Sequence, residues 1–216
     1  MTVILCFGDS VTQGFWDSQG GWVERLKRKL QPQPSVDFFS IFNLGISGDR
    51  SVDVLERFEA EYAARVKELD EGEQVITIFF VGANDAAYLH TRNTTWTAIE
   101  EYEQALQELV TAAKERATRV IVCGVLPCDD KKTDPVPWTL PSGERISYRA
   151  EVAKRFDGVA RTIAQDKLVE FVDIQSLFPI GSGGEAFFRD GAHPNDEGHQ
   201  RIADAISAEI RKARKV

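Results

Sequence analysis

The sequence contains few of the residues that bind metal ions or form disulfides. Its 216 residues include three histidines, three cysteines and one methionine. Three cysteines are an odd number, and Cys6, Cys123 and Cys128 are not clustered, which argues against a disulfide framework or a zinc site. Because Cys6 and Cys123 lie inside apolar runs, we expect buried, reduced thiols and no cysteine nucleophile.

Long hydrophobic runs are also missing. No apolar run approaches the roughly 20 residues that are needed to cross a bilayer, so the sequence predicts no membrane span. The opening stretch MTVILCFGDS has no basic residue before its short apolar run and no small-residue cleavage site. This pattern favours a strand over a signal peptide, and we therefore predict a soluble protein in the cytoplasm.

Basic residues are fewer than acidic ones, so the formal net charge is −8 at pH 7. Nucleic acids and anionic membranes are bound through clustered Lys and Arg, so we predict neither as a partner. The one basic cluster, RKARK at 211–215, is expected to complement the negative end of a final helix. A small, neutral or weakly charged substrate fits this composition better.

The chain alternates between apolar runs and charged, amphipathic stretches, at a length that suits a single domain, residues 1–216. Helical spacing of apolar residues marks the stretches 21–30 and 98–115. This order predicts an α/β fold, with a central five-stranded parallel sheet covered by helices on both faces. The runs are rich in β-branched and aromatic residues, as fully buried strands are, and cover 2–8, 36–44, 74–82, 119–127 and 168–174.

In such a fold, ligands bind beyond the carboxyl ends of the strands, where the loops gather. Four of these loops carry unusual sequences: GDSVTQG, NLGISGD, GAND and DGAHPN. A fifth connection, residues 127–147, is rich in proline and charge. Uninterrupted loops of this length are uncommon in compact domains, so we expect this segment to have a function, such as covering the site as a lid.

Ser10 follows the first strand directly and precedes what looks like the start of a helix. A serine there would expose its hydroxyl at the carboxyl edge of the sheet, as a nucleophile should. Asp9 and Ser10 could equally act as helix caps, so this loop alone leaves both interpretations open. The loop matches neither a phosphate-binding loop nor the G-x-S-x-G elbow.

A nucleophilic serine needs a base, and three histidines are available. His90 lies in a polar loop without a carboxylate at helpful spacing, and His199 shares the apolar face of a final helix. His193 is the best candidate, because Asp190 can curl back to its Nδ1 and leave Nε2 facing Ser10. A metal site built from Asp190, His193 and His199 is the alternative, but its spacing matches no strong zinc signature, and we predict no metal.

Acyl transfer also needs donors for the oxyanion that develops on the substrate. The backbone N–H of Gly48 can approach a ligand closely because glycine lacks a Cβ. Asn84 offers a side-chain amide after the third strand, and the N–H of Ser10 is the third candidate donor. Taken singly, Gly48 could be an ordinary turn residue and Asn84 could form an Asx-turn. Helix-capping residues follow His193, with Asn195 as the expected N-cap.

With these motifs in place, the sequence resembles the SGNH hydrolase superfamily, also called GDSL-type esterases and lipases. The resemblance covers the whole chain, with GDSVTQG, ISGD, GAND and DGAHP in the order of the four family blocks. It implies a three-layer α/β/α sandwich of the flavodoxin type. By this similarity Ser10 is the nucleophile, His193 the base and Asp190 its orienting partner, while Gly48 and Asn84 join the Ser10 N–H in the oxyanion hole.

The activity that this resemblance implies is hydrolysis of small carboxylic esters through an acyl-enzyme intermediate, without a cofactor. Carbohydrate acetyl-esterase, thioesterase, lysophospholipase and acyltransferase activities are the alternatives on the same scaffold. A binding module without activity would have lost a catalytic residue, and none is lost here. Four aromatic residues beside the loops could line an acyl or sugar pocket: Trp16, Tyr88, Trp96 and Trp138.

Overall fold

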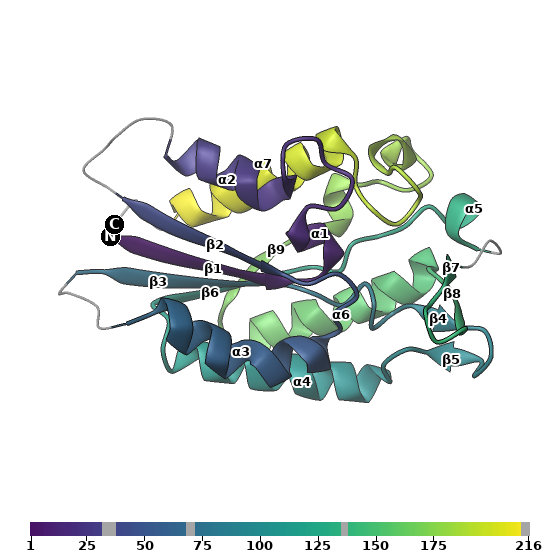
Figure 1. The fold of residues 1–216 in the computed structure, drawn as a ribbon, viewed down its shortest axis with the longest axis horizontal. Coiled ribbons are helices and arrows are strands. Elements are labelled where there is room, and N and C mark those ends of the chain that lie inside the picture. The colour runs from purple at the N-terminus through teal and green to yellow at the C-terminus, as the bar shows by residue number, and fades with distance from the viewer. Residues whose placement is uncertain (32–37, 68–71, 135–137, 213–216) are drawn as a thin grey trace.

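The computed structural model describes residues 1–31, 38–67, 72–134 and 138–212. Its centre is a five-stranded sheet in which every pairing is parallel (Figure 1). The strands are β1 (Thr2–Gly8), β2 (Phe39–Gly45), β3 (Gln74–Phe80), β6 (Arg119–Cys123) and β9 (Glu170–Val172). They lie in the order β2-β1-β3-β6-β9. This doubly wound order confirms the predicted α/β class and directs every carboxyl end toward one edge of the sheet.

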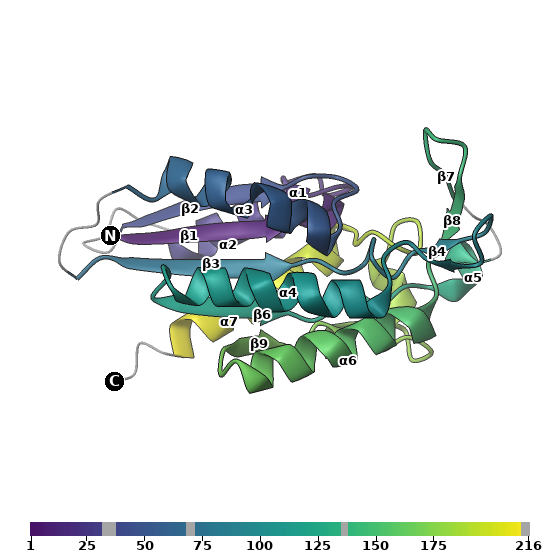
Figure 2. The same cartoon turned by 90° about the horizontal axis from the view of Figure 1, so that it is seen from below.

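Helices cover both faces of the sheet (Figures 1 and 2). The helix pair α2 and α7 lies on one face, and α3, α4 and α6 lie on the other. Together with the sheet they form the predicted three-layer sandwich. The long helices are α2 (Gly21–Leu30), α3 (Ser51–Arg65), α4 (Ile99–Lys114), α6 (Ala150–Asp166) and α7 (Asp196–Lys212), and the short ones are α1 (Ser10–Gln13), α5 (Asp130–Thr133), η1 (Gln175–Leu177) and η2 (Gly184–Phe187).

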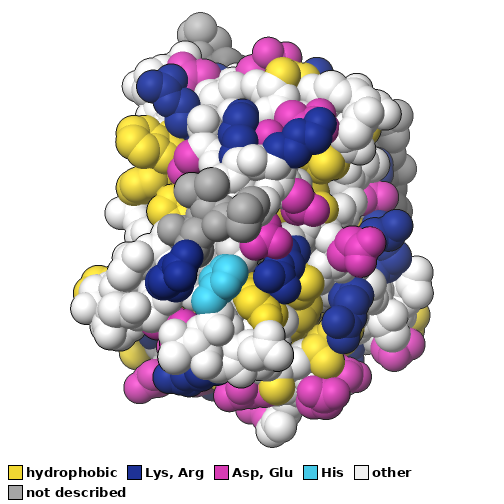
Figure 3. All heavy atoms as spheres, turned by 90° about the vertical axis from the view of Figure 1, so that its right-hand side faces the viewer, with side chains coloured by type: hydrophobic (Ala, Val, Ile, Leu, Met, Phe, Trp, Pro, Cys, Tyr) yellow, Lys and Arg dark blue, Asp and Glu magenta, His cyan; other side chains and the backbone are white. Residues whose placement is uncertain are grey.

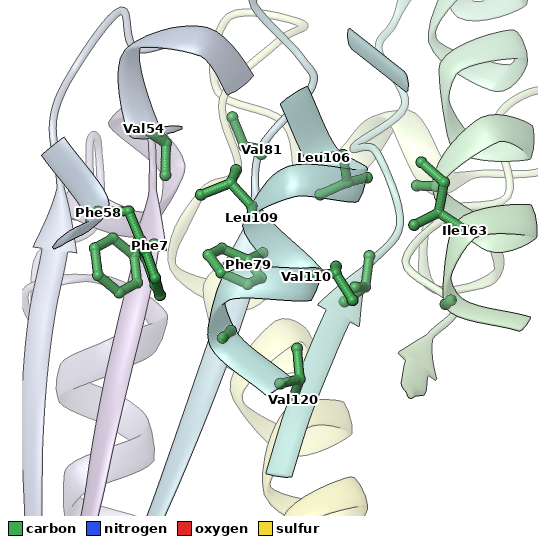
Figure 4. Packing of buried hydrophobic residues seen from close by; sticks show 14 of the residues in the cluster. Phe7, Val54, Phe58, Phe79, Val81, Leu106, Leu109, Val110, Val120 and Ile163 are labelled. Atoms are coloured by element: carbon green, nitrogen blue, oxygen red, sulfur yellow. The ribbon is translucent and has the colours of Figure 1, made fainter. Parts of the chain in front are cut away.

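The continuous apolar run of β1 reflects burial on both faces, because successive side chains point to opposite sides of a strand. Leu5 and Phe7 pack in the core under α3, α4 and α6, whereas Ile4 and Cys6 pack in the core under α2 and α7. In the first of these cores the Phe7 ring lies 5.2 Å from that of Phe58, centroid to centroid (Figure 4). The free cysteines Cys6, Cys123 and Cys128 are buried, as predicted.

A second, smaller sheet stands beside the carboxyl edge of the main one (Figure 2). Its short antiparallel strands are β4 (Tyr88–Leu89), β5 (Thr94–Thr95), β7 (Trp138–Thr139) and β8 (Arg145–Ser147). Residues 127–147 are predicted as a loop from the sequence, but the described part of this segment contains α5, β7 and β8. Elements of two to four residues are too short to show a hydrophobic period, so sequence patterns miss them.

The main-sheet predictions were right about which segments form strands and less accurate about where those strands end. The run 119–127 extends four residues beyond β6, and 168–174 extends beyond β9 at both ends. Residues 36–37 of the second run and 213–215 of the basic tail lie outside the described residues. None of the described helices is long and apolar enough to cross a membrane. The cytoplasmic location stays a prediction.

Candidate active site

Ser10 stands at the point where β1 ends and α1 begins. Asp9 is the N-cap of α1, and its Oδ1 accepts a hydrogen bond of 2.9 Å from the N–H of Val11. The capping interpretation therefore holds for Asp9, and Ser10 is the first helical residue of α1. The carboxyl end of β2 packs closely here, since a Cβ on Gly45 would lie 2.2 Å from the nitrogen of Gln13.

Ser10, His193 and Asp190 form one hydrogen-bonded chain. The Ser10 Oγ lies 3.0 Å from His193 Nε2, and His193 Nδ1 lies 2.8 Å from Asp190 Oδ2. Because a carboxylate only accepts, it selects the tautomer with the proton on Nδ1, which leaves the Nε2 lone pair for the serine hydroxyl. A serine poised to lose a proton to an imidazole is the arrangement that activates a hydroxyl for attack.

The Asp190 carboxylate is held by its own loop. Its Oδ1 accepts hydrogen bonds from the N–H groups of Ala192, at 3.0 Å, and His193, at 2.8 Å. Partial burial raises the pKa of this carboxyl, but the hydrogen bonds and the charge interaction with His193 outweigh it, so the pKa lies well below its usual range. Asp190 is therefore ionised under ordinary conditions and favours the imidazolium that forms when His193 takes up a proton.

A tryptophan adds a further contact to this carboxylate. The Trp16 Nε1 donates a 3.0 Å hydrogen bond to Asp190 Oδ2, the same oxygen that faces His193. Trp16 adopts a positive φ of 64°, which is uncommon for a bulky residue, and half of it is exposed. Beside it, Phe15 places its ring centroid 4.9 Å from that of His193. Phe15 therefore packs against His193, and Trp16 contacts the carboxylate that faces it.

Asn84 lies after β3, within the GAND loop, and is buried. Its Nδ2 donates a 3.0 Å hydrogen bond to the carbonyl of Asp49, and its Oδ1 accepts a 2.9 Å hydrogen bond from the hydroxyl of Tyr148. The next residue, Asp85, accepts hydrogen bonds from the N–H and hydroxyl of Ser51. The GAND loop is therefore tied to the start of α3 and to the loop that contains Gly48.

Gly48 occupies the turn between β2 and α3. Its φ of +90° requires a residue without a side chain, and no atom lies within 4 Å of the position its Cβ would take. The turn is closed by a 3.1 Å hydrogen bond from the N–H of Asp49 to the carbonyl of Ile46. Gly48 therefore directly precedes Asp49, whose carbonyl accepts the hydrogen bond from Asn84. It is exposed and is not among the residues that line the pocket around Ser10.

The pocket around Ser10 is small, with a cavity volume of about 20 Å³. Figure 3 looks onto this end of the molecule, where apolar, acidic and basic side chains lie close together. The walls are mainly small or apolar. They are formed by Asp9, Ser10, Val11, Ala83, Asn84, Ala86, Leu126, Pro127, Cys128, Tyr148, Arg149, Ala153, Ala192 and His193.

The aromatic residues expected from the sequence to line an acyl or sugar pocket do not line this one. Trp96 lies under the guanidinium of Arg50, and Trp138 packs edge-on against Tyr148. Tyr88 lies under the guanidinium of Arg149, and Trp16 lines a neighbouring groove. Tyr148 and Leu126 line the pocket instead. Neither residue follows from the sequence pattern, because Tyr148 follows a three-residue strand and Leu126 lies within the run predicted as a strand.

The other two histidines do not join the site. His199 is fully buried in α7, as predicted, and its Nε2 lies 3.0 Å from the carbonyl oxygen of Phe15. It therefore does not converge with Asp190 and His193, as the metal alternative would require. His90 lies away from the site, with its Nε2 3.1 Å from the hydroxyl of Ser147. Asn195 caps α7 as expected, with its Oδ1 accepting from the N–H of Gly198.

The parallel sheet thus carries a hydrogen-bonded chain of serine, histidine and aspartate at its carboxyl edge. The model of the GDSL-like lipase/acylhydrolase family matches residues 6–201. The chain belongs to this family and is an ester-hydrolysing enzyme. A search of curated proteins gives no match.

Solved structures share the fold over nearly the whole chain. A lipase/acylhydrolase from Enterococcus faecalis is 21% identical with a TM-score of 0.74, and the alignment covers 99% of this chain and 97% of that one. An acetyl xylan esterase is 20% identical with a TM-score of 0.73, over 97% and 100% of the two chains. An acetylxylan esterase from Geobacillus stearothermophilus is 21% identical with a TM-score of 0.69, over 97% and 94%.

Proposed function

We propose that this enzyme hydrolyses small carboxylic esters with Ser10 as the nucleophile, His193 as the general base and Asp190 as the residue that orients the histidine. The observation that supports this proposal most strongly is the continuous chain from Ser10 Oγ to His193 Nε2, at 3.0 Å, and from His193 Nδ1 to Asp190 Oδ2, at 2.8 Å. Ser10 and His193 of this hydrogen-bonded chain line a pocket, so a substrate carbonyl can reach the serine.

The reaction proceeds in two steps. The Ser10 oxygen attacks the ester carbonyl while its proton passes to His193 Nε2, and the same proton then passes to the departing alcohol. His193 next takes a proton from water, the hydroxide adds to the acyl carbon, and the Ser10 oxygen leaves with that proton as the acid is released. Asp190 remains ionised and stabilises the imidazolium in both steps. No cofactor takes part.

In the proposed oxyanion hole, the donors are the N–H groups of Ser10 and Gly48 and the Nδ2 of Asn84. Asn84 lines the pocket with Ser10, and one of its two amide hydrogens is bonded to Asp49, which leaves the other for the substrate. Gly48 lies one residue from Asp49 in the chain, and its positive φ turns the backbone of the loop. Removal of one such donor from a hydrolase typically costs about 3 kcal/mol of transition-state stabilisation.

The pocket favours a short acyl chain. Its cavity is small, about 20 Å³, and its apolar wall is short, with Val11, Ala86 and Leu126 among its members. An acetyl or butyryl group can be buried against these side chains, whereas a long chain must extend into solvent and gains no further burial. We therefore infer a preference for short-chain esters.

Acetylated carbohydrates are the second candidate substrates. Trp16 is exposed and lines a groove next to Asp190. Polar residues, among them Asp17, Ser18 and Asn195, line the same groove. An exposed indole beside hydroxyl and amide groups matches the mixed apolar and polar surface of a sugar. Two of the structurally similar proteins are described as acetyl xylan esterases, which supports this candidate at the level of a shared fold.

A series of p-nitrophenyl esters from acetate to decanoate, and acetylated xylo-oligosaccharides, tests the proposal on the wild type and on Ser10→Ala. We expect kcat/KM to fall with chain length and the alanine variant to lose activity by roughly 10⁴-fold or more. A variant that retains wild-type activity would overturn the assignment of the nucleophile. Parallel assays with a thioester, a lysophospholipid and an added acceptor alcohol distinguish the thioesterase, lysophospholipase and acyltransferase alternatives.

A further inference from the structure

The carboxamide of Asn84 can help an oxyanion only through its nitrogen end. An amide that is rotated by 180° would present Oδ1 to the substrate and repel the developing negative charge. The orientation is therefore part of the catalytic function and must be set by hydrogen-bond partners. Two partners contact Asn84, one at each end of the amide.

The carbonyl of Asp49 contacts the nitrogen end, and the hydroxyl of Tyr148 contacts the oxygen end, at 3.0 Å and 2.9 Å. A flipped amide would place two carbonyl oxygens against each other at Asp49. The same flip would turn the amide nitrogen toward the Tyr148 hydroxyl, which could accept from it but would lose the acceptor of its own proton. The two contacts thus favour the same orientation, in which one N–H remains available to the pocket.

The Tyr148 hydroxyl is suited to donate at this place. Burial raises the pKa of the phenol, and the charges of Asp9 and Asp190 raise it further, so the hydroxyl keeps its proton. Donation to the carbonyl end of an amide also draws electrons from its nitrogen, which makes the remaining N–H a stronger donor. This second effect acts in the same direction as the geometric one.

Tyr148 is itself held in position from two sides. Its carbonyl accepts a 2.6 Å hydrogen bond from the hydroxyl of Thr133, and its ring packs edge-on against Trp138, with centroids 5.3 Å apart. Both contacts come from the segment after β6, which carries α5, β7 and β8. The segment with α5, β7 and β8 therefore positions Tyr148, which follows β8 and lines the pocket next to Ser10.

We propose that Tyr148 is a positioning residue for the oxyanion hole: its hydroxyl fixes the Asn84 carboxamide with Nδ2 toward the substrate. The inference rests on the proposed function, because it needs Asn84 to be an oxyanion donor. It gives the small sheet, which lies outside the four sequence motifs, a role in the site.

The test is a double-mutant cycle of Tyr148→Phe and Asn84→Ala, assayed with p-nitrophenyl acetate. Tyr148→Phe removes only the hydroxyl, and we expect kcat to fall about tenfold while KM stays within about twofold. In the Asn84→Ala background the same change should have no further effect on kcat, because the group that it positions is gone. Tyr62→Phe is the matched control, since that hydroxyl bonds the carbonyl of Arg116 away from the site.

The possible results distinguish a failure of this inference from a failure of the proposed function. If Tyr148→Phe keeps the wild-type kcat, or lowers it equally in both backgrounds, the inference is overturned. A rise in KM alone would mean that the hydroxyl binds substrate directly, which also overturns it. Thermal unfolding of each variant excludes a general loss of structure. The proposed function fails separately, if the wild type is inactive on every ester or if Ser10→Ala remains active.

Discussion

The two sides of Ser10 are built in different ways. On the base side, Asp190 and His193 lie three residues apart, and the backbone N–H of His193 bonds the same carboxylate as its ring. On the oxyanion side, Asn84 is held by Asp49 and Tyr148, at separations of 35 and 64 residues. A local loop thus positions the proposed base, whereas long-range packing assembles the proposed oxyanion hole.

The two sides also differ in charge. Asp190 is ionised, and its pKa is held low by the hydrogen bonds around it, which outweigh its partial burial. Asn84 and Tyr148 are neutral, and their interaction depends on orientation. We therefore expect the base side to respond most strongly to the removal of charge, and the oxyanion side to the removal of a single well-placed donor.

Asp190→Asn is expected to have the largest effect among the predictions for the two sides. The amide nitrogen would donate to His193 Nδ1 and stabilise the tautomer whose proton faces Ser10, and the imidazolium would lose its counter-charge. We predict a fall in kcat of about 10³- to 10⁴-fold. Asp173→Asn is a control on an exposed carboxylate that faces Arg161. A loss below tenfold would show that the charge of Asp190 is not needed.

Asn84→Ala should have the next largest effect. It removes one of three proposed donors and leaves the other two, so we predict a loss of about 10²- to 10³-fold in kcat with little change in KM. Steady-state kinetics with p-nitrophenyl acetate measure both constants. A rise in KM with unchanged kcat would assign Asn84 to ground-state binding and would remove the oxyanion role from this side of the site.

The difference between the two sides also explains how much of the site could be predicted from sequence. Asp190 and His193 are close in the chain, so their pairing follows from spacing. The contact between Tyr148 and Asn84 joins segments 64 residues apart, and that between Trp16 and Asp190 joins segments 174 residues apart. No local pattern encodes such contacts, because they depend on how the small sheet and the first loop pack in three dimensions.

The fold follows the same rule. Residues 2–8 were predicted in full as β1, because a strand that is buried on both faces is apolar throughout. The run 119–127 is equally apolar, yet β6 ends at Cys123 and the rest of the run turns toward the pocket. Apolar character reports burial and does not report hydrogen bonding between strands, so the ends of strands are less predictable than their existence.

Asp9 offers a comparison with Asp190 within the same site. Burial raises the pKa of Asp9 to about 6, whereas that of Asp190 is lowered. Between about pH 4 and pH 6 folded Asp9 holds a proton that the unfolded chain has lost, so this group destabilises the fold as pH rises. Asp9→Asn should therefore gain up to about 3 kcal/mol in free energy of unfolding, relative to wild type, between pH 4 and pH 7.

Urea unfolding of both proteins at several pH values measures this gain, and the comparison across pH cancels any constant packing effect of the substitution. Asn retains an oxygen that can accept from the N–H of Val11, so the cap of α1 is preserved. A stability difference that does not change with pH would show that Asp9 is ionised in the folded protein above pH 4.

Trp16→Phe should have the smallest effect and sharpens the comparison between the two sides. It removes one donor from Asp190, which keeps its hydrogen bonds from the N–H groups of Ala192 and His193 and from the His193 ring. Because these contacts hold the carboxylate without the indole, we predict a fall in kcat of only about threefold.

The hydroxyl of Tyr148 has no such substitutes at Asn84 Oδ1 among the described contacts, so its removal should lower kcat more. Kinetics of Trp16→Phe and Tyr148→Phe measured side by side test this order, and a larger loss for Trp16→Phe would show that the base side depends on long-range contacts as much as the oxyanion side does.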